Sequence, residues 1–528
     1  MKRVLALTLA MVMLMAMFSG CTKTETDTTA ASGGSESADG TESTEGKNIR
    51  TDLVSAEPAD IVTFDPAEST DSYSNKAINL VFDTLVDLDE NSEFIPGLAE
   101  SWEYTDDTTL VFKIRENVKF HNGEILTPSD IKFTMDRVAE TPQSKNFVAD
   151  VEEVIADDEN MTVTFKMKQP SASLMVNLTE AGCHILNRKA VEEAGDKVAQ
   201  TPVGTGPMKL KEWKVNNECI LERFDEHWAG TPKATSITLR VMPESNSRTI
   251  ALETGEVDMV TPISAIDIAR IKENPDLKTL EMESSTITYL SMNHSKAPFD
   301  NLKVRQAVHY ACDKQSLIDV IYEGYALPGI SPFPTIMPYF DESLEGMYTY
   351  DIEKAKALMA EAGFPNGIDR PIEICVSSDE RNRAAQILQS SFAEIGIQLD
   401  IAVMEFGTLM EHCNNGTHDM FIMGWGHATN QDRTMTNNFY TESIGPTGNR
   451  QWYSNPEVDK LIEEGRRELD TTKREQIYKD LQRIIMEDVA WVPLFQQINV
   501  YGLDAGLEGV IWHKRGTAYY ADGYVVED

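Results

Sequence analysis

Strand signals alternate with helix signals along most of the chain, and this alternation restricts the possible folds more than any other feature. Leu110, Phe112 and Ile114 recur at period two, which is typical of a half-buried strand. Residues 127–130 read Thr-Pro-Ser-Asp, with a capping hydroxyl, a proline at the first helical position and a carboxylate three residues after the cap. This pattern predicts a helix to about Ala139. Strands that alternate with helices favour an α/β architecture.

The alternation is clearer beyond residue 300. Asp351 can cap a helix that Gly363 ends, and a second helix over 385–395 is stopped by Gly396. Alternating apolar residues then predict a strand over 397–403. The remaining elements that we expect are a buried strand over 420–425 and helices over 457–467 and 472–487.

The first 20 residues have the pattern of a processing segment. Two basic residues precede an apolar run from Val4 to Phe18, which is shorter than the roughly 20 residues that span a bilayer but suits a signal peptide. Ser19 and Gly20 directly before Cys21 resemble the bacterial lipobox, in which the cysteine is diacylated and becomes the new N-terminus. We therefore predict a lipoprotein signal peptide over 1–20 and lipidation at Cys21. The alternative is ordinary signal cleavage nearby, which leaves a free soluble protein.

Residues 22–47 are dominated by Thr, Ser, Gly, Asp and Glu and contain no aromatic residue. Such a segment cannot bury a core, so we expect a disordered tether between the lipidated cysteine and a folded body. No other apolar run is long enough to span a membrane. The sequence thus predicts a body held at the outer face of the cytoplasmic membrane, at the cell surface or in the periplasm.

Composition excludes some partners. The chain has 528 residues, which corresponds to about three domains, and a formal charge of −39. A surface this acidic repels phosphate backbones, so we expect no nucleic-acid binding. Five cysteines follow Cys21, an odd number without a CxxC motif, and a single disulfide is possible but cannot be assigned. These are Cys183, Cys219, Cys312, Cys375 and Cys413.

No catalytic or metal motif is evident. The sequence has neither a GxSxG elbow nor an HExxH motif, so we predict that the protein is not an enzyme and uses no cofactor. Residues 203–207 (Val-Gly-Thr-Gly-Pro) lack the spacing of a phosphate loop and indicate a tight interdomain crossover. His412, Cys413, His418 and His427 could form a soft-metal site, but their spacing matches no closed zinc pattern. We therefore predict no metal site.

An ordered series of motifs resembles the family 5 extracellular solute-binding proteins of ABC transporters, the oligopeptide, dipeptide and nickel receptors. One motif is Pro-Gly-Leu-Ala-Glu-Ser-Trp at 96–102, and another is Gly-Trp-Gly at 424–426. The resemblance covers nearly all of 50–500, and its motifs lie at 64–67, 70–74, 96–102, 118–130, 203–207, 221–223, 227–228, 248–258, 298–307, 351–367, 424–426 and 453–459.

The resemblance implies an α/β, two-lobed periplasmic-binding-protein (type II, clamshell) fold. Lobe I would comprise 48–85, 201–290 and 491–528, with an inserted subdomain over 86–200, and lobe II would comprise 291–490. A peptide or peptide-like solute would bind in the cleft, close the lobes and be delivered to ABC permease subunits. We expect a monomer. Two alternatives remain open: a nickel chelate, oligosaccharide or other small solute on the same fold, or an extracytoplasmic hydrolase or sensory docking protein.

The resemblance also implies ligand-binding residues. Many peptide receptors of this family have an aspartate after the strand that ends near Trp425, and its carboxylate fixes the ligand ammonium; Ala428 stands there in this chain. Asp432 is the nearest replacement, in a Thr-x-x-Asp loop similar to that of some receptors for glutathione; otherwise the ligand lacks a free amine. The predicted residues are Ser72 and Tyr73 at the rim of lobe I, Asn293 and His294 near the hinge, and Trp425 (as a flat wall), His427, Thr429 and Asp432 in lobe II.

Lipidation is tested by Cys21→Ser. This variant lacks the thiol that carries the lipid, so we expect it to move from the membrane fraction to the aqueous fraction on detergent phase partitioning. A Thr22→Ser variant keeps the thiol and stays with the membrane. Membrane retention of Cys21→Ser would refute lipidation at this residue.

Overall fold

The computed structural model describes residues 48–89, 93–426, 430–513 and 518–527. The chain divides into two units, 1–46 and 47–528, and all the described residues lie in the second. The signal peptide, Cys21 and the tether fall outside the described residues, so these predictions stay predictions. Within the described ranges, no helix combines the length and apolar character needed to cross a bilayer.

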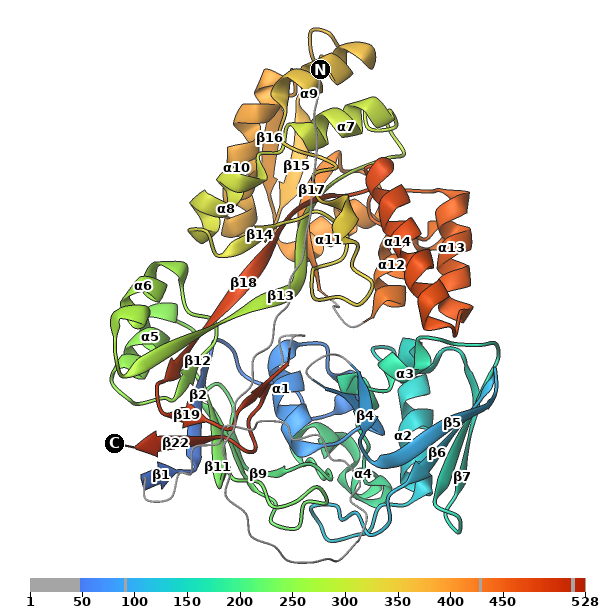
Figure 1. Cartoon of the computed structure of the whole chain (residues 1–528), viewed down its shortest axis with the longest axis vertical. Coiled ribbons are helices and arrows are strands. Elements are labelled where there is room, and N and C mark those ends of the chain that lie inside the picture. Colours follow the sequence, from blue (N-terminus) through green and yellow to red (C-terminus); the bar gives the residue numbers. More distant parts are fainter. Residues whose placement is uncertain (1–47, 90–92, 427–429, 514–517, 528) are drawn as a thin grey trace, which may run out of the picture. The chain divides into compact units, whose positions relative to one another are not determined.

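The central element is a mixed sheet of eleven strands (Figure 1). In spatial order the strands are β16 (Leu399–Val403), β15 (Ile372–Val376), β17 (Met420–Gly426), β13 (Leu277–Met292), β18 (Val492–Asp504), β12 (Met259–Val260), β2 (Asp52–Glu57), β11 (Ser236–Val241), β10 (Glu218–Arg223) and β9 (Met208–Lys214), with β14 (Ala326–Pro328) also paired to β18. The α/β class predicted from the alternating pattern is confirmed.

Two long antiparallel strands join the two lobes. β13 has 16 residues and β18 has 13, and they pair from Leu277 with Asp504 to Leu290 with Val492. The register is interrupted between Glu283 and Ile287. On one side of this interruption the pair contacts β12, and on the other side β13 pairs with β17 from Thr286 onward. In Figure 1 the green strand β13 and the red strand β18 run between the two halves of the body.

The strand and helix predictions for lobe II are confirmed, with shifted ends. Asp351 caps a helix over 352–361, and Gly363 follows at φ 94°. The helix expected at 385–395 begins six residues earlier, because the hydroxyl of Ser378 caps it. The helices of lobe II are α7 (Leu302–Tyr310), α8 (Lys314–Tyr322), α9 (Ile352–Glu361), α10 (Asp379–Glu394), α11 (Phe406–Asn414), α12 (Gln431–Phe439), α13 (Pro456–Arg467) and α14 (Thr471–Glu487).

A separate antiparallel sheet lies within the range 86–200. Its strands, in order, are β5 (Ala99–Asp106), β6 (Thr109–Ile114), β8 (Thr162–Met167) and β7 (Val151–Asp157), and α2 (Pro128–Glu140) packs on it. The predicted capping box opens α2, since Asp130 Oδ2 accepts from the Thr127 amide at 2.9 Å and from its hydroxyl at 2.7 Å. This range also holds β3 (Val86–Leu88), β4 (Phe94–Pro96), α3 (Leu174–Asn177) and α4 (Arg188–Ala194).

The rest of the body completes lobe I. Its helices and strands are β1 (Asn48–Arg50), α1 (Ser72–Val81), α5 (Ser245–Glu253), α6 (Ala265–Glu273), β19 (Leu507–Glu508), β20 (Ile511–Trp512), β21 (Ala518–Tyr519) and β22 (Tyr524–Glu527). The lobe boundary proposed at 290/291 falls within β13, where the backbone is continuous strand, and the one at 490/491 falls just before β18. The boundaries themselves stay predictions.

The tight passage of the chain at 203–207 is confirmed, and the interdomain character of the crossover stays a prediction. The Gly206 amide donates to the Val81 carbonyl at 3.0 Å, and a Cβ on Gly204 would meet the same carbonyl oxygen. The Cys183, Cys219, Cys312, Cys375 and Cys413 side chains, which account for the described cysteines, are free and buried.

Gly204→Ala tests the crossing. The added methyl would collide with backbone at the end of α1, so we expect the free energy of unfolding in urea to fall by about 1–3 kcal/mol. Gly346→Ala is the control, because its Cβ meets nothing within 4 Å and only its φ of +76° opposes the change. An equal loss in both variants would contradict the close approach.

Candidate ligand-binding site

The first wall of the candidate site is the start of α1 in lobe I. Asp71 caps this helix, with Oδ1 accepting from the amides of Tyr73 at 3.0 Å and Ser74 at 2.8 Å. Ser72 is exposed and Tyr73 is half-buried. Lys76 follows Tyr73 by three residues, so the two side chains share one side of the helix.

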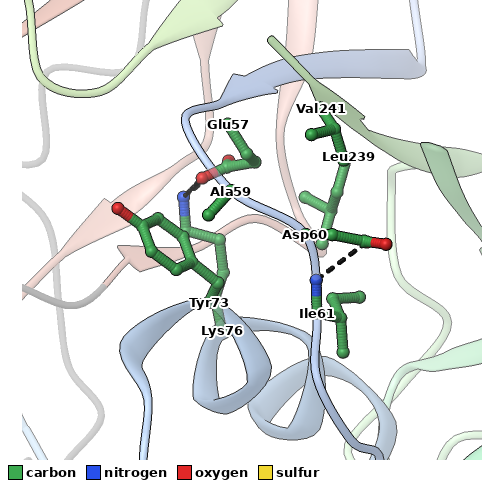
Figure 2. Close-up of a pocket in the computed structure, with 8 residues that line it drawn as sticks. All are labelled: Glu57, Ala59, Asp60, Ile61, Tyr73, Lys76, Leu239 and Val241. Atoms are coloured by element: carbon green, nitrogen blue, oxygen red, sulfur yellow. Dashed lines mark hydrogen bonds and ion pairs between the residues drawn. The ribbon is translucent and has the colours of Figure 1, made fainter. Parts of the chain in front are cut away.

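A buried ion pair fixes this helix to the end of β2, as Figure 2 shows. Lys76 Nζ lies 2.7 and 2.8 Å from the two carboxylate oxygens of Glu57, and the Ser55 hydroxyl donates to the same carboxylate at 2.6 Å. Burial alone disfavours the charged lysine, but the Glu57 carboxylate outweighs it and raises the pKa of Lys76. Burial, helped by Glu57, also raises the pKa of Tyr73.

The pocket beside this ion pair is small. Its lining residues are Glu57, Ala59, Asp60, Ile61, Tyr73, Lys76, Leu239 and Val241 (Figure 2). Its volume of about 10 Å³ is close to the space that one water molecule needs. In this conformation the pocket cannot hold a peptide.

The second wall is the end of β17 in lobe II. Gly424 pairs with Thr288 of β13 and Gly426 pairs with Thr286. Trp425 between them is half-buried and packs against the hydrophobic cluster of α12–α14, and its Nε1 donates to Thr434 Oγ1 at 3.2 Å. The indole is therefore held in place while part of its surface stays accessible.

A guanidinium group lies over the same strand end. A Cβ on Gly424 would lie 3.3 Å from Arg381 Nη2 and 3.1 Å from Thr286 Cγ2, so the missing side chain makes room for both neighbours. Arg381 Nη1 donates to Ser377 Oγ at 3.3 Å. Within the described part of the chain, Arg381 forms no ion pair. A half-buried cation without a carboxylate partner is suited to an anionic ligand group.

Direct hydrogen bonds connect lobe II to the 86–200 range. Asn430 Nδ2 donates to Asn177 Oδ1 at 2.6 Å. The Ala172 amide donates to the Arg466 carbonyl at 3.0 Å, and Arg474 Nη1 donates to the Ala172 carbonyl at 3.1 Å. In Figure 1 these contacts lie where α3 faces α12–α14. The two lobes are thus in contact in this structure, as in a closed clamshell.

Asp432 belongs to this interlobe contact. The carboxylate is buried, lies 3.5 Å from Arg466 Nε and accepts from Thr436 Oγ1 at 3.3 Å. Burial raises the pKa of Asp432 to about 6, although Arg466 and Arg474 oppose the shift. Asp432, which was predicted to bind the ligand ammonium, therefore already forms an ion pair with Arg466.

Asn293 and His294 do not lie near the hinge, so that prediction is wrong. They follow the end of β13 where Met292 pairs with Met420, whereas the cleft end of β17 at Gly426 pairs with Thr286. The reason is the length of β13, whose 16 residues extend well into lobe II before the strand ends at Met292.

Both side chains have local structural roles instead. Asn293 is fully buried, and its Nδ2 donates to the carbonyls of Gly416 at 2.9 Å and His418 at 3.2 Å. The His294 ring packs edge-on against Tyr453 with 5.4 Å between ring centres. Burial lowers the pKa of His294 well below its ordinary value. His427, Thr429 and Ala428 lie outside the described residues.

Three features of the site escaped the sequence analysis. Arg381 was missed because the start of α10 was placed after it, although Ser378 followed by two acidic residues is a usual helix start. Asn430 caps α12 through the Arg433 amide at 2.9 Å, and its bond to Asn177 joins positions 253 residues apart. The Glu57–Lys76 pair also depends on tertiary contact.

Comparison with known proteins agrees with this geometry. The family model "Bacterial extracellular solute-binding proteins, family 5 Middle" matches residues 93–446. The glutathione-binding protein GsiB of Pectobacterium atrosepticum is 30% identical over 454 residues, which cover 84% of this chain and 88% of that protein.

Two solved structures are similar along nearly their full length. The periplasmic binding protein DppA of Helicobacter pylori, in complex with the peptide STSA, has a TM-score of 0.77 and 27% identity over 92% of this chain and 99% of its own. The substrate-binding protein CtaP of Listeria monocytogenes has a TM-score of 0.82 and 23% identity over 91% and 100%, and shows the fold.

The chain belongs to family 5 of the bacterial extracellular solute-binding proteins. It is an extracytoplasmic receptor of the kind that delivers a solute to an ABC permease, and it is a binding protein and not an enzyme. The two-lobed fold expected from the motifs is confirmed.

The burial of Asp432 predicts a dependence on pH. Its raised pKa means that the stability contributed by its protonated form is present below pH 4 and is lost as the pH rises through about 6. The Asp432→Asn variant has no carboxyl group to ionise at this position, so it does not lose this stability as the pH rises. We expect the variant to match the wild type at pH 4 and to exceed it by up to about 3 kcal/mol in unfolding free energy at pH 7.5. Urea unfolding at both pH values checks this, and a difference that is independent of pH would contradict it.

Proposed function

We propose that the chain binds a peptide or peptide-like solute between lobe I and lobe II, and that it is a monomer anchored to the membrane through Cys21. The observation that carries the ligand class is Arg381, a half-buried guanidinium at the cleft end of β17 that forms no ion pair in the described ranges. Peptides end in a carboxylate, which a guanidinium binds in a bidentate manner.

Glutathione is the first candidate. The GsiB relative carries that ligand in its name and matches 84% of this chain. Glutathione has two carboxylates and one ammonium group, so its net charge at neutral pH is negative. A protein of net charge −39 repels such a ligand at long range, and a local cation has to compensate. Arg381 supplies that cation.

We propose further contacts with the solute from the start of α1 in lobe I and from the end of β17 in lobe II. Ser72 and Tyr73 would contact the solute from lobe I, and Trp425 would form a flat wall in lobe II. His427 and Thr429, on the segment after β17, remain proposed contacts. Asp432 would act on the ligand ammonium or, since it already pairs with Arg466, would support the closed form.

Closure follows from binding to both lobes. A ligand shifts an open–closed equilibrium only by the difference in its affinity for the two states. A solute held by Arg381 on lobe II and by the α1 wall on lobe I would be bound fully only when the lobes meet. Asn430–Asn177 and the Ala172 contacts would then add to the closed state.

Arg381→Gln tests the anchor. Removing one partner of a desolvated charge pair costs about 2–5 kcal/mol, so we expect glutathione to bind at least about 30-fold more weakly by isothermal titration calorimetry. Arg383→Gln is the matched control, because Arg383 is exposed on the same helix and should change the affinity less than twofold.

The possible results distinguish an error in the proposed ligand from an error in the proposed role of Arg381. If the wild type binds a dipeptide and not glutathione, and Arg381→Gln weakens the dipeptide, then the anchor is right and the proposed ligand is wrong. If Arg381→Gln leaves every ligand unaffected, the anchor is wrong. Small-angle scattering of the wild type with and without ligand then reports closure independently of Arg381.

A further inference from the structure

Three side chains of metal-binding type meet in lobe II, away from the cleft. Glu373 and Cys375 are two residues apart on β15, so they share one face of the sheet, and His412 projects from α11. Their potential ligand atoms all lie within 4.8 Å of one another. Glu373 Oε1 lies 2.7 Å from His412 Nε2 and 3.3 Å from Cys375 Sγ.

The cluster is separate from the proposed solute site. Cys375 is level with Phe421 of β17, and Gly426 lies five residues further along that strand. At about 3.3 Å per residue, the two places are roughly 16 Å apart along the sheet. A ligand at the cleft therefore does not account for these residues.

The hydrogen bonds of His412 direct a lone pair into the cluster. The Thr417 hydroxyl donates its only hydrogen to the His412 carbonyl oxygen at 3.0 Å, so its oxygen accepts from Nδ1, which lies 2.5 Å away. In the neutral ring Nε2 then carries a lone pair that faces the Glu373 carboxylate at 2.7 Å. Two lone pairs at this distance repel each other unless a proton or a metal cation lies between them.

The outer contact of the ring has the form usual at metal sites. A histidine ligand normally donates its second ring N–H to an oxygen, which fixes the tautomer and the orientation of the ring. Thr417 fills this role for His412. The side chains of His412 and Glu373 are 29% and 39% exposed, so an ion can reach the cluster from solvent and keep a water ligand.

We propose that Glu373, Cys375 and His412 bind a divalent cation of the Zn²⁺ class. Nitrogen, sulfur and carboxylate oxygen together suit a borderline-soft ion, and the usual bond lengths of about 2.0–2.3 Å place the ligand atoms of a tetrahedral site roughly 3.3–3.8 Å apart. The present atoms reach that spacing by shifts of about an ångström. On binding, the Cys375 thiol gives its proton to solvent and the thiolate sulfur bonds to the metal.

Bound metal would tie β15 to α11, which are 30 residues apart in sequence, and so brace lobe II. The sequence pattern predicted no metal site, and the set of residues considered there was a different one. Of His412, Cys413, His418 and His427, only His412 belongs to the cluster found among the described residues, and its partners come from a strand almost 40 residues earlier.

The test is a titration of the full chain with Co²⁺ and Zn²⁺ after dialysis against a chelator. We expect one Zn²⁺ per chain by calorimetry and, with Co²⁺, a sulfur-to-cobalt charge-transfer band in the near ultraviolet. Cys375→Ser should remove the band and weaken Zn²⁺ binding at least tenfold. Cys312→Ser, a buried thiol in another cluster, should leave both unchanged.

His412→Gln is the second variant, and circular dichroism verifies that each variant is folded. The His412→Gln variant should weaken Zn²⁺ binding at least tenfold, although its Cys375 thiol is still present. A wild type without the charge-transfer band, or a band that survives in Cys375→Ser, would overturn the proposal. Zn²⁺ binding that is unchanged in both folded variants would also overturn it.

Discussion

The antiparallel pairing of β13 with β18 links the two lobes and limits how they can move. Both strands pass from lobe I to lobe II, and the register of their ladder shifts between Glu283 and Ile287 and again between Thr288 and Tyr289. Backbone hydrogen bonds tie the lobe I end of the pair to β12 and the lobe II end to β17. The two lobes can therefore move relative to each other only by bending this pair, and the walls of the cleft approach along a defined path.

Hydrogen bonds between lobe II and the 86–200 range contribute to the closed arrangement. Asn430 with Asn177, Ala172 with Arg466, and Arg474 with Ala172 are each worth about 0.5–1.5 kcal/mol in net terms. A bound solute can outweigh individual contacts of this strength and shift the equilibrium. A receptor needs this balance, because a body locked shut without ligand could not admit one.

Charged side chains with a structural role can be told from candidate ligand-binding side chains by whether other residues pair with them. Glu57 with Lys76, and Asp419 with Arg370 and Lys296, are paired and serve to fix elements in place. Arg381 and the Glu373–Cys375–His412 cluster differ, because their donor or acceptor capacity exceeds what the surrounding protein uses. Excess capacity of this kind points to a ligand more directly than abundance of charge, which in a chain with 86 acidic residues carries little information.

The class of fold, most helix and strand positions in lobe II and the family could be predicted from the amino-acid sequence, because they depend on local periodicity, helix caps and an ordered set of motifs. The capping box at Thr127 and the stop at Gly363 are examples. Where the strands cross between the lobes, and which side chains meet, depends on contacts between residues far apart in the sequence. Asn293 was misplaced because β13 extends 16 residues, into lobe II, and Glu373 and His412 are brought together by sheet and helix packing that no local signal encodes.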